Sequence, residues 1–278
     1  MEEVRSGKKK PNEEKVMTFW DHLDDLRKHI IRSMVAIVVL AIIAFLNREI
    51  IFDNIILAPS NTDFISNKAM CWLGHQISVE ALCFEPMKLD IININMSGQF
   101  MTHMYISAVA GFILAFPYIL WEIWSFVRPA MKEKEQKYSR GGILISTFLF
   151  MIGILFSYFV IVPLTVNFLG TYSVSATVHN QISLNSYIST VVSLTFAVGV
   201  VFELPILIYF LTKIGIVTPD YLKKNRRYMF IVILIISAII TPPDVFSQTM
   251  VAIPLVALYE LSIIVSKRVY RKSYEEVG

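Results

Sequence analysis

One carboxylate interrupts a long apolar run of the sequence, VGVVFELPILIYF at 198–210. If this run crosses a membrane and Lys213 marks its inner boundary, Glu203 lies about 15 Å inside, near the bilayer midplane. A carboxylate at that depth is costly, so it is expected to face the bundle interior or a water-filled cavity. Pro205 cannot donate to the carbonyl of Val201, which leaves an acceptor nearby and predicts a bent helix. A functional polar site and a protonated side chain bonded to a neighbouring helix both remain open, and we favour the first.

Two shorter segments concentrate charged residues that could bind a ligand. TFWDHLDDLRKHI, at 18–30, repeats apolar residues at helical spacing, which predicts an amphipathic helix along the inner membrane surface that leads into the first span. Its charged side is also explained as a solvated face in which Asp24 pairs with Lys28, and from composition alone we favour that explanation. MKEKEQK, at 131–137, has the same alternative, because its glutamates stand among lysines.

No motif for catalysis or metal binding occurs in the sequence. HExxH, GxSxG and phosphate-binding loop patterns are absent, and so is a cysteine pair at zinc spacing. The five histidines are scattered, and His103 is expected to face the helix bundle rather than to bind a ligand. We therefore expect no enzyme, no metal and no cofactor. Cys71 and Cys83 fall in the first outer loop, where an oxidising compartment would allow a disulfide, although two free or buried thiols fit equally well.

Membrane helices are the elements that must position these residues. The chain has 278 residues, is 55% hydrophobic and has a mean hydropathy of +0.59. We predict an all-α polytopic membrane protein with a single membrane domain over 1–278, because no repeat and no inserted soluble domain is visible. The charged N-terminus lacks a cleavage site, so the first span is expected to stay as an anchor. The six predicted spans are 29–46, 100–127, 141–163, 187–212, 228–240 and 245–265.

Basic residues fall almost entirely in alternate connecting segments. They gather in the N-terminal segment, near 128–140, near 213–227 and in the C-terminal tail. The exceptions among the 25 lysines and arginines are Arg48, Lys68 and Lys88. Because cytoplasmic loops are enriched in Lys and Arg, these segments are expected to face the cytoplasm. Both termini are then cytoplasmic, with 1–17 as a flexible tail and 267–278 as a second tail.

The predicted span at 228–240 is unusually short. Its 13 apolar residues cover only about 20 Å as a helix. TPPD follows at 241–244, where two prolines stop the helix and Asp244 can cap the next one. The last two spans are therefore expected to form a tight outer hairpin, whose mismatch thins the membrane locally or is buried against protein.

Six segments follow one another along the chain in a specific order. They are HLDDLRKH at 22–29, FPYILWEIWSFVRPAMKEKE at 116–135, GILFSYFVIVPL at 153–164, FAVGVVFELP at 196–205, RRYMFIV at 226–232 and TPPDVFSQTMVAIPLVALYE at 241–260. Together they resemble the TatC family, the receptor subunit of the twin-arginine protein translocase. The resemblance covers nearly everything from 18 to 266, except a first outer loop near 60–90. It implies six transmembrane helices in a curved, glove-like bundle with cytoplasmic termini.

The resemblance implies a receptor for signal peptides that carry paired arginines, which helps to move folded proteins across the membrane with the proton motive force. Arginine pairs best with carboxylates, so such a receptor needs an acidic site on its cytoplasmic side. By resemblance that site falls on Asp25 and Glu135, with Asp24 as a helper. The family usually has Glu at the first position, so Asp25 is a shorter substitute. Arg27 and Phe126 occupy further motif positions.

Partner contacts are also implied by the resemblance. In the family, Glu203 faces the hollow of the bundle, where the membrane segment of a partner or signal peptide can approach. Thr241, Asp244 and Gln248, at the outer ends of the last two spans, resemble a polar contact site for the small single-span proteins TatA and TatB. The expected setting is an oligomeric complex in the lipid of the bacterial cytoplasmic membrane, with no nucleic acid.

Two other classes of function remain open from the sequence. A proton-coupled secondary transporter would use Glu203 as its proton or ion site, but repeated halves and a second buried charge in a corresponding span are not visible. An intramembrane enzyme would need a nucleophile and a base, or a metal site, and neither pattern occurs. The sequence therefore favours the receptor.

Overall fold

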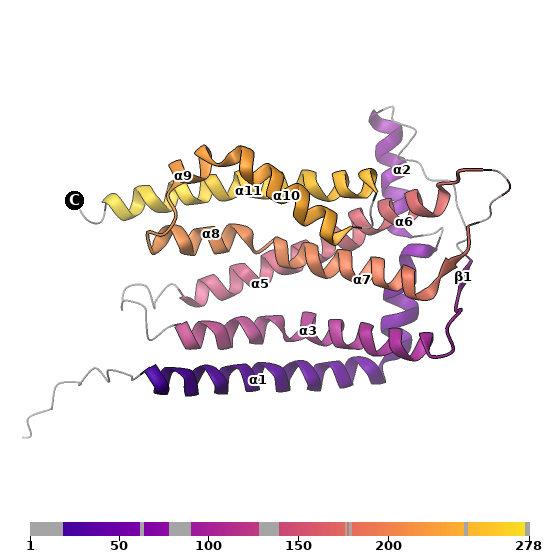
Figure 1. Ribbon diagram of the computed structural model, residues 1–278, viewed down its shortest axis with the longest axis horizontal. Helices are drawn as coiled ribbons and strands as arrows, with labels where there is room; N and C mark the ends of the chain where they lie inside the picture. The colour runs from indigo at the N-terminus through magenta and orange to yellow at the C-terminus, as the bar shows by residue number, and fades with distance from the viewer. Residues whose placement is uncertain are drawn as a thin grey trace, which may run out of the picture.

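Long helices that lie side by side make up most of the chain (Figure 1). The computed structural model describes residues 19–61, 64–77, 90–127, 139–175, 177, 180–241 and 244–275. Within these described residues, five stretches are long and apolar enough to cross a membrane, which makes the chain a multi-pass membrane protein, as predicted. The longest helices are α1 (Phe19–Leu46), α3 (Gly98–Val127), α5 (Ser139–Phe156), α7 (Leu184–Val201) and α11 (Val245–Glu275).

The first and last helices extend beyond the predicted spans. The segment at 18–30 was expected to run along the inner membrane surface as an amphipathic helix into the first span, but α1 is one uninterrupted helix from Phe19, and the stretch that can span a membrane already begins at His22. At the other end, α11 continues to Glu275, so most of the predicted tail at 267–278 extends the last helix. The predicted tail at 1–17 lies outside the described residues.

The predicted fifth span is α10 (Arg226–Ile240), a helix of 15 residues. It is shorter than the five stretches that can cross a membrane, so the count of six spans stays a prediction. Asp244 caps the following helix, as expected, since its Oδ1 accepts a 2.6 Å hydrogen bond from the backbone N–H of Ser247. The predicted prolines between them lie outside the described residues.

Two spans are interrupted rather than straight. The span at 187–212 was predicted to bend, but it divides into α7 and α8 (Leu204–Lys213) around a turn at Phe202 and Glu203. Within that turn the backbone N–H of Glu203 donates to the carbonyl of Val200 at 3.1 Å, and Pro205 supplies no donor for the next turn. The preceding span likewise passes from α5 through a π-helical turn, η5 (Ser157–Ile161), into α6 (Val162–Thr171).

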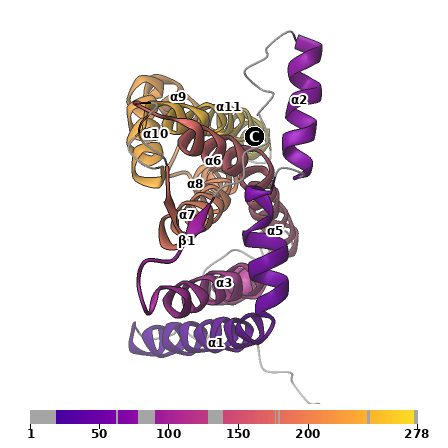
Figure 2. The ribbon, with the colours of Figure 1, turned by 90° about the vertical axis from the view of Figure 1, so that its right-hand side faces the viewer.

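Short elements close the opposite end of the bundle, where α1 ends. They are η1 (Glu49–Ile56), η2 (Ala58–Ser60), α2 (Ile65–Ile77) and β1 (Ile91–Ile92), which pairs in parallel with β2 (Ile182–Ser183). One short helix, α9 (Pro219–Lys224), lies at the other end (Figure 1). Figures 1 and 2 show η1 and α2 crossing the direction of the long helices. Two tyrosines of the spans bind η1, because Tyr158 donates to the carbonyl of Ile55 at 2.7 Å and Tyr187 donates to that of Ile56 at 3.0 Å.

Glycines let the long helices approach closely. α1 lies at one edge of the bundle against α3 (Figures 1 and 2), and a Cβ on Gly111 would come within 2.6 Å of the backbone N of Ala41. Between α5 and α7, a Cβ on Gly153 would come within 2.9 Å of Cα of Gly199. Small residues at such crossings let the helices pack closely. In lipid, this van der Waals packing holds helices together in place of the hydrophobic effect that acts in soluble proteins.

We expect Gly111→Leu to separate α1 from α3, because its side chain would have to occupy the backbone of Ala41. Such overpacking costs about 1–3 kcal/mol or more. Thermal unfolding in detergent should show a clearly lower midpoint than for the native chain. Gly141→Leu is the matched control, because a Cβ at Gly141 meets nothing within 4 Å; equal midpoints for the two variants would contradict the close crossing.

Candidate functional site

Polar and aromatic side chains face one another where α1 begins and α3 ends. α1 brings Asp25 and His29, which are one helical turn apart, and α3 brings Tyr118, Glu122 and Phe126 at the same spacing. Residues four apart share one face of a helix, and α1 packs along α3. We call these five residues the α1–α3 corner. It lies at the end of the bundle that the basic residues predict to be cytoplasmic.

Glu122 is the most deeply buried member of the corner, with only 1% of its surface exposed. Its Oε1 accepts a 2.6 Å hydrogen bond from the hydroxyl of Tyr118, and its Oε2 accepts a short hydrogen bond from Nδ1 of His29. A buried carboxylate is stable only when its charge is paired and its lone pairs are hydrogen-bonded. One partner comes from the same helix and the other from α1, so Glu122 joins the two helices.

His29 connects this buried carboxylate with one near the surface. Its second ring nitrogen, Nε2, lies 3.8 Å from Oδ2 of Asp25. The side chain of His29 is 14% exposed and that of Asp25 is 35% exposed. The contacts therefore run from the buried Glu122 through the imidazole to a carboxylate that an external ligand can reach.

Aromatic stacking brings Phe126 into the same corner. Its ring stacks on His22 with centroids 4.4 Å apart and planes 18° apart, and meets the edge of His29 at 6.0 Å. The corner thus presents an accessible carboxylate beside an aromatic ring, and His29 contacts both. This pairing of groups suits a cationic side chain with an apolar stem.

The structure brings together only part of the predicted recognition site. Asp25 and Phe126 meet through His29. Asp24 and Arg27 are exposed on α1, and within the described part of the chain neither forms an ion pair, so the predicted Asp24–Lys28 pair is wrong. Glu135 lies outside the described residues, so its place in the site stays a prediction.

Glu122 and His29, at the centre of the corner, were not among the residues predicted from the sequence. Glu122 stands in ILWEIW, at 119–124, as the only charged residue of a long apolar run. A carboxylate in a span is costly at either position, so Glu122 was recognisable in the same way as Glu203. A buried carboxylate therefore occurs in a second span, where the sequence alone had suggested none. His29 could have been found from its place four residues after Asp25, on the same face of the helix.

Glu203 lies against α5, so this carboxylate within a span faces protein, as predicted. The hydroxyl of Ser146, which is 2% exposed, donates a short hydrogen bond to its Oε2. Phe202, the other residue of the turn, packs 5.8 Å from the ring of Phe156. A neighbouring helix therefore supplies a hydrogen-bond donor to one oxygen of this carboxylate. A role for Glu203 in partner binding stays a prediction.

The predicted partner-contact residues all bond within the bundle. Thr241 is 6% exposed and donates to the carbonyl of Ser237 at 2.8 Å, on its own helix. Gln248 is half-buried, and its Nε2 donates to the carbonyl of Leu234 at 3.1 Å, which links α11 to α10. Asp244 caps α11. Contact of these residues with partner proteins stays a prediction.

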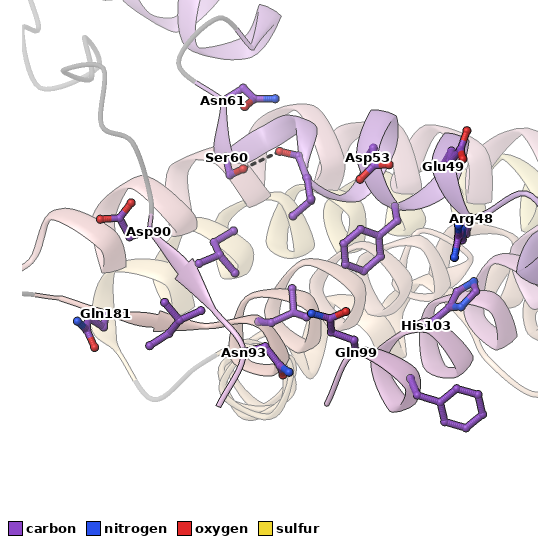
Figure 3. Close-up of a pocket in the computed structure, with 16 residues that line it drawn as sticks. Arg48, Glu49, Asp53, Ser60, Asn61, Asp90, Asn93, Gln99, His103 and Gln181 are labelled. Carbon is purple, nitrogen blue, oxygen red and sulfur yellow. Dashed lines mark hydrogen bonds between the residues drawn. The ribbon is translucent and has the colours of Figure 1, made fainter. Parts of the chain in front are cut away.

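A polar cavity of about 1330 Å³ opens at the opposite end of the bundle, between η1, β1 and the start of α3 (Figure 3). His103 is on its wall and faces the bundle as predicted, since its Nε2 lies 3.1 Å from the carbonyl oxygen of Phe45.

Among the described residues, no group of His, Cys, Asp or Glu could hold a metal ion. Cys71 is on α2 and Cys83 lies outside the described residues, so their bridge stays a prediction.

Fold and site together define a class of protein. The chain is a multi-pass helical membrane protein with a buried carboxylate in one span, a partly buried one in another, and an acidic and aromatic corner at the end of one helix pair. Residues 21–254 match the family described as Sec-independent protein translocase protein (TatC). The chain therefore belongs to the TatC family, whose members are non-catalytic receptor subunits of a protein translocase.

Known relatives cover nearly the whole chain. The Sec-independent protein translocase protein TatC of Blattabacterium sp. subsp. Periplaneta americana is 41% identical over 264 residues, which are 94% of this chain and 99% of the relative. TatC of Carboxydothermus hydrogenoformans is 38% identical over 94% of this chain and 98% of the relative. TatCy of Bacillus subtilis is 34% identical over 92% of this chain and 91% of the relative.

Solved structures agree with the family assignment. A crystal structure of the twin arginine translocase receptor TatC superposes with a TM-score of 0.70 at 32% identity, covering 89% of this chain and 99% of that one. A second, of the same receptor in DDM, gives a TM-score of 0.71 at 33% identity over 88% of this chain. The predicted family is thereby confirmed, and the chain takes part in a translocase with the other Tat components.

Proposed function

We propose that this protein is the receptor of the twin-arginine translocase and binds twin-arginine signal peptides at the α1–α3 corner. The observation that carries the proposal is the contact of His29 with both Asp25 and Phe126, which places an accessible carboxylate beside an aromatic ring. The crystal structures that this chain resembles are of a protein named as the twin arginine translocase receptor.

Paired arginines and this corner are chemically complementary. A guanidinium group binds a carboxylate with two parallel hydrogen bonds and stacks on aromatic rings, and a lysine ammonium does neither as well. Asp25 supplies the first carboxylate. Glu135 follows the end of α3 by eight positions, close enough along the chain to supply a second one. Because lysines flank Glu135, attraction by net charge is weak and local geometry must select the ligand.

Export requires further components, which the family membership indicates. We propose that the chain scaffolds TatA-type and TatB-type single-span proteins in the bacterial cytoplasmic membrane, in an oligomeric complex that exports folded proteins with the proton motive force. Glu203 and Gln248 are the polar groups within the spans that we assign to partner contact. In lipid, each such interhelical hydrogen bond is worth only about 0.6–2 kcal/mol, so several contacts are needed.

We expect Asp25→Ala and Glu135→Ala each to weaken binding of a twin-arginine signal peptide by about tenfold, the loss expected for one charge-assisted hydrogen bond. Photo-crosslinking of a labelled signal peptide to the purified protein measures the effect. Asp220→Ala is the control, because Asp220 is a 92% exposed carboxylate that pairs only with Lys223 at 3.5 Å. Unchanged crosslinking in the double variant with Asp25→Ala and Glu135→Ala would contradict the assignment of these residues to signal-peptide binding.

We expect Gln248→Leu to change crosslinks to TatA-type and TatB-type partners and to leave assembly of the bundle intact. α10 and α11 also pack along each other and share the ion pair of Arg226 with Glu260 at 2.6 Å. Loss of the bond from Gln248 to the carbonyl of Leu234 therefore costs little stability. Thr249→Val is the control, since the hydroxyl of Thr249 donates only within its own helix, to Val245. Identical crosslink patterns for Gln248→Leu and Thr249→Val would contradict the contact.

A further inference from the structure

We propose that Glu122 is a positioning residue for recognition of paired arginines. It holds His29 so that the imidazole orients Asp25 and Phe126 without neutralising the carboxylate. The inference rests on the proposed function, since it concerns how the same corner selects its ligand. Glu122 is itself 1% exposed and so does not touch the peptide.

The first step is the anchoring of His29. Nδ1 of the ring bonds Oε2 of Glu122, whose other oxygen is held at 2.6 Å by the hydroxyl of Tyr118. Both oxygens of the buried carboxylate are therefore occupied, and its position along α3 is fixed. With Nδ1 engaged, the ring can turn only within narrow limits, and Nε2 is directed toward Asp25.

The second step concerns the distance between His29 and Asp25. Nε2 and Oδ2 are 3.8 Å apart, which is longer than a hydrogen bond. The oxygens of Asp25 therefore stay available to a guanidinium group, while a polar neighbour restricts the side chain. A binding group that is already ordered in the free protein loses less conformational entropy when the ligand binds.

The third step is the balance of charge. Glu122 receives its hydrogen bonds inside the protein, from His29 and from Tyr118. Among the residues that the structure describes, Asp25 has only the longer contact with His29. If Glu122 were apolar, the imidazole would lose its anchor and could close on Asp25 at hydrogen-bond distance. It would then compete with the incoming arginine.

Phe126 depends on the same anchor. It follows Glu122 by one turn of α3 and meets the edge of His29 at 6.0 Å. Its other face stacks on His22 at 4.4 Å. Movement of His29 would therefore disturb the aromatic ring and the carboxylate together, although they belong to different helices.

The experiment compares the affinity of the full chain, in detergent or nanodiscs, for two synthetic signal peptides that differ only in an Arg-Arg or a Lys-Lys pair. We expect the native chain to prefer Arg-Arg and Glu122→Leu to lower the ratio of the two affinities by about tenfold. Glu122→Gln should restore most of the ratio, because an amide oxygen can still accept from Nδ1 of His29. Tyr118→Phe removes one bond to Glu122 and should have the smaller effect.

A merely structural role for Glu122 predicts a different result. It would weaken both peptides equally and leave the ratio unchanged, which would overturn the proposal. Thr102→Val is the control for disturbing a buried hydroxyl of α3 far from the corner, since Thr102 is 2% exposed and bonds only its own helix.

Two further outcomes separate the proposals. If Glu122→Leu does not fold, His29→Leu removes the same link from the less buried side and must lower the ratio; an unchanged ratio would again overturn the inference. If the native chain itself binds Arg-Arg and Lys-Lys peptides equally, the proposed function fails. A native preference that survives in both Glu122→Leu and His29→Leu refutes only the positioning role.

Discussion

The buried carboxylate of Glu122 is the constraint on which the α1–α3 corner depends. In a membrane protein such a group must find its partners within the protein, because lipid offers none. Here one partner comes from the same helix and the other, His29, from α1. Close packing at Gly111 brings the two helices near enough for that bond to form. α1 packs mainly on α3, so this pair of helices depends on the contact more than the interior helices do.

Two spans are interrupted, one at a carboxylate and one just before a proline. Glu203 lies in the turn between α7 and α8, where the hydroxyl of Ser146 on a neighbouring helix donates to one of its two carboxylate oxygens. The π-helical turn η5 precedes Pro163, which cannot donate within a regular helix. Irregular backbone at membrane depth is tolerated only where protein covers it. Both interruptions lie inside the bundle, and η5 packs on α7. A carboxylate thus accompanies one of the two interruptions and a proline follows the other.

The sequence predicted the class of fold and most helix positions, because long apolar runs and proline stops depend on local chemistry alone. It predicted the family from six ordered segments, and comparison with known proteins confirmed that family. It could not predict that α1 continues straight from Phe19, since an amphipathic pattern does not fix the direction of a helix. It also missed Glu122, whose importance depends on a histidine 93 residues earlier in the chain. Such a pairing follows from helix packing, and no local pattern records it.

Recognition of paired arginines by the α1–α3 corner is the central claim. The most direct test places a photo-reactive amino acid at position 126, beside Asp25 and His29, and adds a twin-arginine signal peptide. Position 100 provides the comparison, because Phe100 is 56% exposed on the same helix at its opposite end. We predict an adduct at position 126 that maps next to the arginine pair, and none at position 100. Adducts of equal yield at both positions, or none at 126, would contradict the claim.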